Sequence, residues 1–373
     1  MIKTAFRFIR YDRPKSIGAL AGVIISVFLV GQQLGIFIFL TNAMAALVRN
    51  NPDYIWVVDN QTSNVNALSP LDMRLGRAVS SVPGVQQVFP VALATAAAKF
   101  ENGESSPMTL IGVQAPEYAG GPWNLVTGKP ENLIQDGAII TEYFDRNALG
   151  DAEVGDYFEL NGRKVFIAGQ TRGVRSFGGV YAFTTIERAR SIGNLDANTA
   201  SAFLVKWDPA VPRQQVIDSI NAYIYGVRAW DPEVLAGETI GTVLSSSGIA
   251  FSFGTLILFA LISGFVIIGL TLYSAAVDRL RDYGTLKAIG ATNGYVRRLI
   301  LSQALLISLT GFAVAVFLIE GFRNGIANAG TIFRFTPAVW GSLLGVTVLI
   351  AVTGSLFAIR RISRLEPAQV FRA

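Results

Sequence analysis

The sequence contains no cysteine and no histidine among its 373 residues. Without cysteine the chain can form neither a disulfide nor a thiolate-bound iron–sulfur cluster, so any domain outside a membrane must be stable through its apolar core alone. Histidine is the commonest metal ligand and the commonest general base near neutral pH, and its absence weighs against metal centres and hydrolytic sites of the usual kinds. The two absences together disfavour an enzyme.

Charged residues are also scarce. They make up 15% of the chain, while 51% of the residues are hydrophobic and the mean hydropathy is +0.44; soluble domains average about 25% charged residues. Four runs contain no Asp, Glu, Lys or Arg: 16–48, 239–277, 299–319 and 335–359. About 20 apolar residues span a bilayer. The sequence therefore predicts an α-helical membrane protein with four transmembrane helices, the last over 336–359.

Two of these runs are longer than a bilayer requires. A helix over 16–48 reaches roughly 50 Å and one over 239–277 roughly 58 Å, whereas the hydrocarbon layer is about 30 Å thick. We expect each excess to continue outward as a helical stalk; the alternative is a loop that lacks charge, which the serines before Gly248 favour. The first run is too long for the apolar core of a signal peptide, so we expect a retained helix.

The distribution of Lys and Arg predicts which parts face the cytoplasm. Segments 1–15, 278–298 and 360–373 together carry a net charge of +10, whereas 49–238 carries −6. We expect both termini and 278–298 in the cytoplasm, 49–238 outside, and 320–335 as a short outer loop. Aromatic residues and arginines alternate in 1–15, which is typical of an amphipathic helix at the inner interface. Because the positive charge lies beside the membrane, it favours lipid contact over nucleic-acid binding.

The segment 49–238 reads as mixed α/β. Alternating apolar residues between turns predict strands, and Asn161-Gly162 predicts a hairpin turn. Ser69 is the expected cap of the first helix. Strands are expected at 53–58, 85–100, 108–113, 137–140, 157–160, 164–168, 180–184, 202–207 and 227–230, and helices at 70–81, 142–149, 185–192 and 211–225. The prediction is an extracytoplasmic α+β domain inserted between transmembrane helices 1 and 2.

No motif for nucleotide hydrolysis or covalent catalysis is present. The sequence has no Gly-x-x-x-x-Gly-Lys-Ser/Thr phosphate loop, no Gly-x-Ser-x-Gly elbow and no zinc-ligand spacing. The acidic pairs Glu142/Asp145 and Glu153/Asp156 read as surface residues of a solvated domain. The charge-free runs also lack the ionisable groups that proton-coupled carriers keep inside the membrane. We therefore expect no catalytic residue, cofactor or metal in this chain, and a power source supplied from elsewhere.

The most informative segment joins the second and third hydrophobic runs. Over 278–292 it reads Asp-Arg-Leu-Arg-Asp-Tyr-Gly-Thr-Leu-Lys-Ala-Ile-Gly-Ala-Thr. Leu286 and Ile289 lie three residues apart, on one face of a short helix, and Gly284 and Gly290 permit sharp entry and exit. This segment resembles the cytoplasmic segment of the MacB/FtsX/LolC-type ABC transporter permeases.

Other parts of the chain resemble the same family. The ending Arg-Leu-Glu-Pro-Ala-Gln-Val-Phe over 364–371 is similar to the family's close, and Val-Pro-Gly-Val at 82–85 is similar to a phrase of its periplasmic core domain. One span, a large outer domain and three further spans is also the family's order. The resemblance implies a DevC-like or HrtB-like single permease subunit without a fused ATPase, with a MacB-like periplasmic core domain, in the bacterial cytoplasmic (inner) membrane.

The resemblance also implies partners. A second permease copy, two cytoplasmic ABC ATPase subunits that bind ATP and Mg, and in some systems a periplasmic adaptor would complete the assembly. Asp282, Tyr283 and Gln303 depart from the family pattern, and we expect them to affect pairing with a particular ATPase. The residues that the resemblance assigns to ATPase coupling are Arg279, Arg281, Asp282, Tyr283, Gly284, Leu286, Lys287, Ala288, Ile289 and Gly290.

The first span contains two pairs of glycines spaced for close helix packing. They are Gly18 with Gly22 and Gly31 with Gly35, and Gln32 and Gln33 could hydrogen-bond across the interface. The alternative is chance pairing in a glycine-rich membrane chain.

The predicted function is the permease subunit of an ABC transporter, which converts ATP-driven motion of a separate ATPase into movement of the extracytoplasmic domain. The output is expected to be export or extraction of a lipid-like, peptide or small-molecule substrate. The alternative is a non-transporting signal relay that controls an extracytoplasmic cell-wall hydrolase, and the partner of the outer domain distinguishes the two. A sensor would need a cytoplasmic output domain, for which 278–298 is too short.

Overall fold

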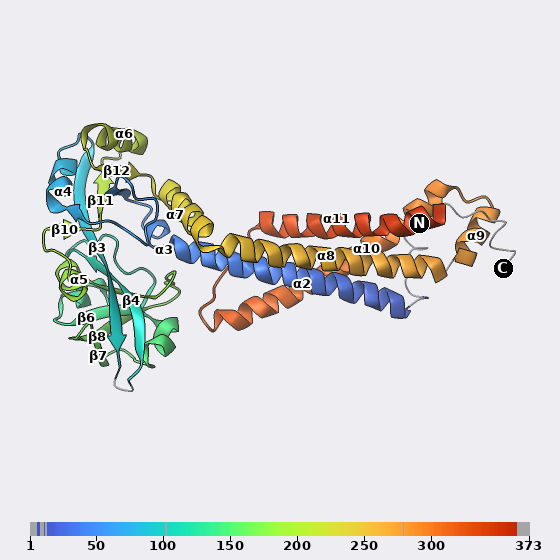
Figure 1. The fold of residues 1–373 in the computed structure, drawn as a ribbon, viewed down its shortest axis with the longest axis horizontal. Helices are drawn as coiled ribbons and strands as arrows, with labels where there is room; N and C mark the ends of the chain where they lie inside the picture. The colour runs from blue at the N-terminus through green and yellow to red at the C-terminus, as the bar shows by residue number, and fades with distance from the viewer. Residues whose placement is uncertain (1–5, 8–10, 12, 101–102, 279, 364–373) are drawn as a thin grey trace. The chain divides into compact units, whose positions relative to one another are not determined.

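The computed structural model describes residues 6–7, 11, 13–100, 103–278 and 280–363 (Figure 1). The chain divides into two compact units, one of Met1–Ile38 and Ile249–Ala373 and the other of Phe39–Gly248. Most of the amphipathic helix predicted at 1–15, and the ending at 364–371, lie outside the described residues.

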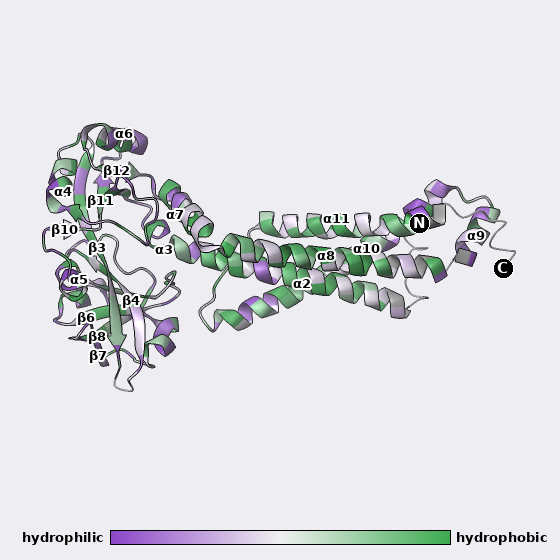
Figure 2. Cartoon of the chain, in the orientation of Figure 1, coloured by the Kyte–Doolittle hydropathy of each residue, from purple (hydrophilic) through white to green (hydrophobic). Residues whose placement is uncertain are grey.

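The first unit consists mainly of long apolar helices. They are α2 (Arg13–Met44), α8 (Ile249–Asp278), α10 (Asn293–Ala327) and α11 (Pro337–Ser363), and hydrophobic residues run along all four (Figure 2). Each is long and apolar enough to cross a membrane. The short helix α9 (Leu280–Ala288) lies between α8 and α10 in the chain. The prediction of four transmembrane helices is confirmed.

Small residues let the long helices approach one another. A Cβ built on Gly354 of α11 would lie 3.2 Å from the backbone nitrogen of Gly269 on α8, which is tighter than ordinary contact, so the two helix backbones approach closely here. In lipid the hydrophobic effect does not drive helices together, so close backbone approach of this kind stabilises them through van der Waals contact. The shared apolar core of the four helices includes Ala19, Val23, Val27, Ala260, Ile268, Ala304, Ile307, Ala315, Leu343 and Ala351.

The second unit is built on one large sheet. In spatial order its strands are β12 (Val227–Trp230), β1 (Ile55–Asp59), β11 (Ala202–Trp207), β3 (Val85–Lys99), β4 (Ser105–Val113), β9 (Val180–Thr185), β6 (Ala138–Glu142), β8 (Arg163–Thr171) and β5 (Leu125–Thr127), with β7 (Tyr157–Leu160) paired to β3 and β8. The pairs β4–β9 and β6–β8 are parallel. The long β3 joins the two halves, because its first part pairs with β11 and its second part with β4.

Helices cover both halves of the sheet. α4 (Met73–Ser80) and α6 (Arg213–Tyr223) pack against β1, β11 and β12, and α5 (Ile186–Gly193) packs against β3 and β4. A third apolar cluster contains α3 (Ala46–Arg49), α7 (Pro232–Ser247) and the two tryptophans Trp56 and Trp230. An α/β domain between the first and second membrane helices is therefore confirmed.

Two predicted helices differ from the observed ones. The helix expected over 70–81 begins at Met73, and Asp72 rather than Ser69 caps it, through a bond from the Arg74 amide. The reason is tertiary: Leu71–Asp72 forms the strand β2, which pairs with β10 (Thr199–Ala200). The helix predicted over 142–149 is the 3₁₀ helix η2 (Tyr143–Leu149), and a second 3₁₀ helix, η1 (Pro130–Ile134), was not predicted.

The stalks are helical but interrupted. α2 ends at Met44 and α3 follows from Ala46. In the second run α7 ends at Ser247, Gly248 takes a φ of +67°, and α8 begins at Ile249. The prediction of one continuous helix over 239–277 is therefore wrong, and so is the alternative of a loop, because left-handed backbone at a glycine ends one helix immediately before the next begins.

Candidate coupling site

The predicted coupling segment folds as α9 and a tight turn into α10. One side of α9 is anchored to the helical unit: Tyr283 is 2% exposed, and Leu286 is half-buried beside it. Their apolar neighbours come from α10 and α11: Val296, Leu299, Ile300, Ala358 and Ile359. A close-packed aromatic ring shared by three helices ties the position of α9 to those of α10 and α11.

The turn after α9 is a Schellman motif. The amide of Ala291 donates to the Leu286 carbonyl at 2.9 Å, and the amide of Gly290 donates to the Lys287 carbonyl at 3.1 Å. Gly290 has a φ of +101°, which only glycine adopts without strain. Thr292 then caps α10 by accepting from the Tyr295 amide. The turn is thus defined by backbone bonds.

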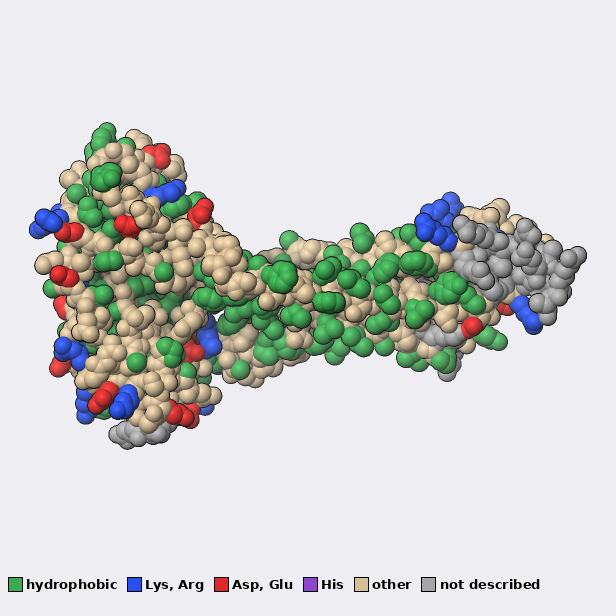
Figure 3. Space-filling model, viewed as in Figure 1, with side chains coloured by type: hydrophobic (Ala, Val, Ile, Leu, Met, Phe, Trp, Pro, Cys, Tyr) green, Lys and Arg blue, Asp and Glu red, His purple; other side chains and the backbone are tan. Residues whose placement is uncertain are grey.

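The opposite side of the segment is exposed. Ile289, at the tip of the turn, is 77% exposed, an unusual position for an isoleucine. Arg281 and Asp282 of α9 are exposed, as are Arg297 and Arg298 in the first turns of α10. Lys and Arg side chains gather at this end of the helical unit, whereas hydrophobic side chains cover the long helices (Figure 3). The exposed side of the segment therefore carries an apolar residue in the turn, three arginines and one aspartate.

The structure changes the predicted roles of three residues. Gly284 lies inside α9, so it does not form an entry turn. Leu286 and Ile289 do not share a face, because α9 ends at Ala288 and the chain turns before Ile289. Tyr283 is buried, so its side chain anchors α9 and is not part of the exposed surface.

The remaining predicted coupling residues are Ala288, Lys287 and Arg279. Ala288 is exposed and Lys287 is half-buried, both in the last turn of α9. Arg279 lies outside the described residues.

Three of the four glycines singled out in the first span pack inside the unit. A Cβ at Gly22 would lie 2.2 Å from Ile267 of α8, and one at Gly31 would lie 2.4 Å from Ile319 of α10. At Gly35 it would lie 2.3 Å from the ring of Phe333, in the connection between α10 and α11. These glycines serve packing within one chain.

The other residues singled out in the first span are packed less closely. Gly18 has no neighbour within 4 Å of a built Cβ. Gln32 and Gln33 are half-buried. On α10, the side-chain nitrogen of Gln303 is buried and has no hydrogen-bond partner among the residues that the structure describes.

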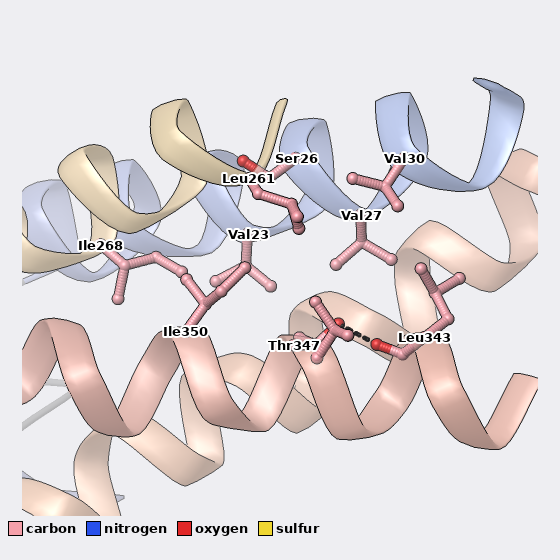
Figure 4. Close-up of a pocket in the computed structure, with 10 residues that line it drawn as sticks. Val23, Ser26, Val27, Val30, Leu261, Ile268, Leu343, Thr347 and Ile350 are labelled. Atoms are coloured by element: carbon pink, nitrogen blue, oxygen red, sulfur yellow. Dashed lines mark hydrogen bonds between the residues drawn. The ribbon is translucent and has the colours of Figure 1, made fainter. Parts of the chain in front are cut away.

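A small cavity lies among α2, α8 and α11. Figure 4 shows its lining, which includes Val23, Val27, Leu261, Leu343 and Ile350. Its volume is about 10 Å³, which is room for one water molecule. The cavity is too small to hold a substrate.

One acidic pair in the second unit was misread. Glu142 is fully buried, not a surface residue. It accepts hydrogen bonds from the Thr171 hydroxyl at 2.7 Å and from the amides of Gly173 at 2.7 Å and Val174 at 2.9 Å. The sequence held one sign of this burial: Glu142 directly follows the apolar residues of β6, which is a buried strand. By contrast, Glu153 and Asp156 are exposed as predicted.

Asp145 is close to this buried carboxylate and forms an ion pair with Arg175. Burial raises the pKa of Asp145 to about 6; the charge of Arg175 lowers it and the charge of Glu142 adds to the rise. The sequence did not predict that Arg175 pairs with Asp145, because Arg175 belongs to the loop after β8 and lies far from Asp145 in the chain.

Comparison with known proteins identifies the C-terminal part of the chain. Residues 254–367, which contain α9, α10, α11 and most of α8, match the family model of the FtsX-like permease C-terminal region. The search of curated proteins found no match.

Two solved structures are similar to part of the chain. The periplasmic region of MacB from Actinobacillus actinomycetemcomitans has 10% identity and a TM-score of 0.39, with 53% of this chain and 94% of that chain covered. The extracellular domain of the ABC-type transporter YknZ from Gram-positive bacteria has 13% identity and a TM-score of 0.35, with 48% and 99% covered. The match over 254–367 confirms the resemblance of the segment 278–292 to the MacB/FtsX-type permeases.

Proposed function

We propose that this FtsX-like permease is the membrane subunit of an ABC transporter whose separate ATPase acts on α9 and the turn 289–292. The single observation that carries this proposal is that this short segment is anchored on one side and exposed on the other. One face of α9 is locked to α10 and α11 through Tyr283, and the turn that follows α9 presents the exposed Ile289. A segment built in this way can receive a push and pass it on.

The helical unit offers a path for that push. Displacement of α9 bears on α10 and α11 through the cluster around Tyr283. α11 in turn contacts α8 closely at Gly269 and Gly354. Rigid packing of this kind moves helices as bodies rather than absorbing the displacement. Because α8 follows α7 in the chain and α2 precedes α3, motion of these membrane helices would pull on the outer unit.

The chemistry of the exposed surface indicates the kind of partner. Ile289 suits an apolar pocket, and Arg281, Arg297 and Arg298 around it suit acidic residues at the rim of that pocket. We propose that this pocket belongs to a cytoplasmic ABC ATPase, which would bind the ATP and Mg. A second permease copy and an adaptor are further partners that we propose by family likeness.

The proposed topology places both termini and α9 in the cytoplasm and 49–238 outside the bacterial inner membrane. It is supported by the net charges of +10 and −6 on the two sets of segments. The proposed output is export or extraction of a lipid-like, peptide or small-molecule substrate. The one-water size of the cavity among α2, α8 and α11 supports a route that avoids the interior of a single chain.

The test is co-purification of the ATPase with the permease carrying Ile289→Asp. A carboxylate at the tip would place a negative charge in an apolar pocket with an acidic rim, so we expect at least a tenfold loss of bound ATPase. The matched control is Ile134→Asp, since Ile134 is 65% exposed but lies in the outer unit. Equal recovery of ATPase with both variants would contradict the proposed docking surface.

A further inference from the structure

The loop 60–70, which joins β1 to β2, is bonded to both helices that enter the second unit. The side-chain amide of Asn66 donates to the carbonyl of Met44, the last residue of α2, at 2.7 Å. The backbone amide of Val65 donates to the hydroxyl of Thr239 on α7 at 3.2 Å. Met44 and Thr239 are fully buried, and Val65 is 1% exposed. One short loop thus holds the end of α2 and the middle of α7 together.

The loop is also attached to the sheet. The amide of Thr62 donates to the Asp59 carbonyl at 3.0 Å, and the Asp59 carboxylate accepts from the Gln61 amide at 3.0 Å. Within the loop, the side chain of Asn64 accepts from the backbone amide of Asn66 at 3.0 Å. Because Asp59 is the last residue of β1, a displacement of the loop moves β1, which lies between β12 and β11 in the sheet.

Direct contact between α3 and α7 is mostly apolar and does not fix the two helices along their axes. Their shared cluster contains Ala46, Leu47 and Ala236, and apolar contact has no preferred direction. The ion pair between Arg49 and Glu233 is 3.8 Å long, its side chains are 36% and 72% exposed, and exposed pairs contribute little. The hydrogen bonds of the loop, which are directional, therefore decide how α2 and α7 are held.

The two connections to the membrane helices differ in stiffness. α2 is a single helix from Arg13 to Met44, so a displacement along its axis reaches its end. α7 is separated from α8 by Gly248, which has a φ of +67° and whose built Cβ would meet none of the described residues within 4 Å. A glycine in this conformation, without neighbours to hold it, is a point at which the backbone can rotate. A displacement is therefore passed on better by α2 than from α8 to α7.

α2 is also interlocked with α10, the helix that follows the coupling site. A Cβ at Gly31 of α2 would lie 2.4 Å from Ile319 of α10, and one at Gly311 of α10 would lie 2.6 Å from Val23 of α2. Each helix thus receives a side chain of the other at a glycine, and close packing of this kind transmits displacement instead of absorbing it. Motion of α10 along its axis therefore moves α2.

We propose that α2 drives the second unit and that the loop 60–70 is the clamp through which it acts. Asn66 and Thr239 are positioning residues, which make β1 and α7 follow the end of α2. This inference rests on the proposed function, in which the ATPase displaces α9, and adds the route by which the displacement reaches the second unit. α8 follows without driving, because the joint at Gly248 takes up the difference.

The test is hydrogen exchange of the reconstituted complex of full-length permease and ATPase, with and without ATP. The response is the ATP-dependent change in exchange of the β1 and α7 amides. In the natural complex we expect a response in β1, α7 and α11. The double variant Asn66→Ala, Thr239→Val removes two hydrogen bonds of the clamp, so the response of β1 and α7 should fall about tenfold. The response of α11, which precedes the clamp on the proposed route, should be unchanged.

Two further variants complete the test. Asn147→Ala, at an exposed asparagine of η2, should respond as the natural protein does. Insertion of two glycines after Gly248 loosens the joint between α7 and α8 and leaves the clamp intact. Because α2 still drives the second unit in that variant, β1 and α7 should keep their response.

Three results would overturn the clamp. They are no response of β1 and α7 in a natural complex whose α11 responds, a full response of β1 and α7 in the double variant, and loss of the response on glycine insertion, which would make α8 the driving helix. A natural complex in which α11 does not respond contradicts the proposed function itself, and the clamp with it. Protection of the β3 amides serves as the measure of folding. If the double variant lowers it, the glycine insertion decides the question.

Discussion

Replacement of Tyr283 by alanine should separate binding of the ATPase from coupling. Tyr283 is 2% exposed and is the largest side chain in the cluster that joins α9 to α10 and α11. Truncation of a buried aromatic ring costs about 3–5 kcal/mol. We take about 3 kcal/mol, because the other face of α9 is open to solvent, and this shifts the docking equilibrium of α9 by roughly a hundredfold. The exposed turn with Ile289 remains available to a partner.

The assay has two measurements on the reconstituted complex. The amount of ATPase recovered with the permease should stay within about threefold of the natural protein. Hydrogen exchange of α11 near Ala358 should change when ATP is added to the natural complex, because α11 shares the Tyr283 cluster. In Tyr283→Ala this ATP-dependent change should disappear. Tyr283→Phe keeps the ring and should keep the response.

The outcome that refutes this reasoning is an intact ATP-dependent change in α11 with Tyr283→Ala. Loss of the response in Tyr283→Phe as well would show that the hydroxyl, and not the packed ring, carries the effect.

Three further pairs of substitutions test the helix packing, the turn after α9 and the buried carboxylate Glu142. Gly35→Ala should destabilise the chain by about 1–3 kcal/mol through overpacking, because its Cβ would lie 2.3 Å from a phenyl ring. In the control Gly18→Ala, in the same helix, the Cβ meets none of the described residues within 4 Å, so the melting temperature in detergent should stay unchanged or rise. Gly290→Val should weaken coupling by straining the turn by about 1–2 kcal/mol, and Gly290→Asn, which tolerates positive φ, should retain most of it; equal loss in both would argue against a backbone cause. Glu142→Leu should cost about 3 kcal/mol in urea unfolding, since at least two buried amides lose their acceptor, whereas Glu153→Gln should stay within about 0.5 kcal/mol.

The membrane helices were predictable because their signal is local. A charge-free run of more than twenty residues has few alternatives to a membrane helix, and each of the four runs overlaps a helix long and apolar enough to cross a membrane. The hairpin at Asn161-Gly162 was predictable for the same reason, since its turn type is set by two residues and both have positive φ.

Features that depend on distant parts of the chain were not predictable. β2 is two residues long and exists only because β10 lies beside it. Glu142 looked like a surface residue until its donors, about thirty positions later, were in place. The burial of Tyr283 was also not predictable, because spacing within α9 does not show that α10 and α11 cover one side of that helix.

The most direct test of the account is a cross-link from the tip of the turn. The chain has no cysteine, so Ile289→Cys introduces a unique thiol for a short bifunctional reagent. In membranes containing the ATPase we predict a cross-link between the permease and the ATPase at 289, and none with Ile134→Cys in the outer unit. Absence of the cross-link at 289, or an equal yield at 134, would contradict the claim that α9 and its turn are where the ATPase acts.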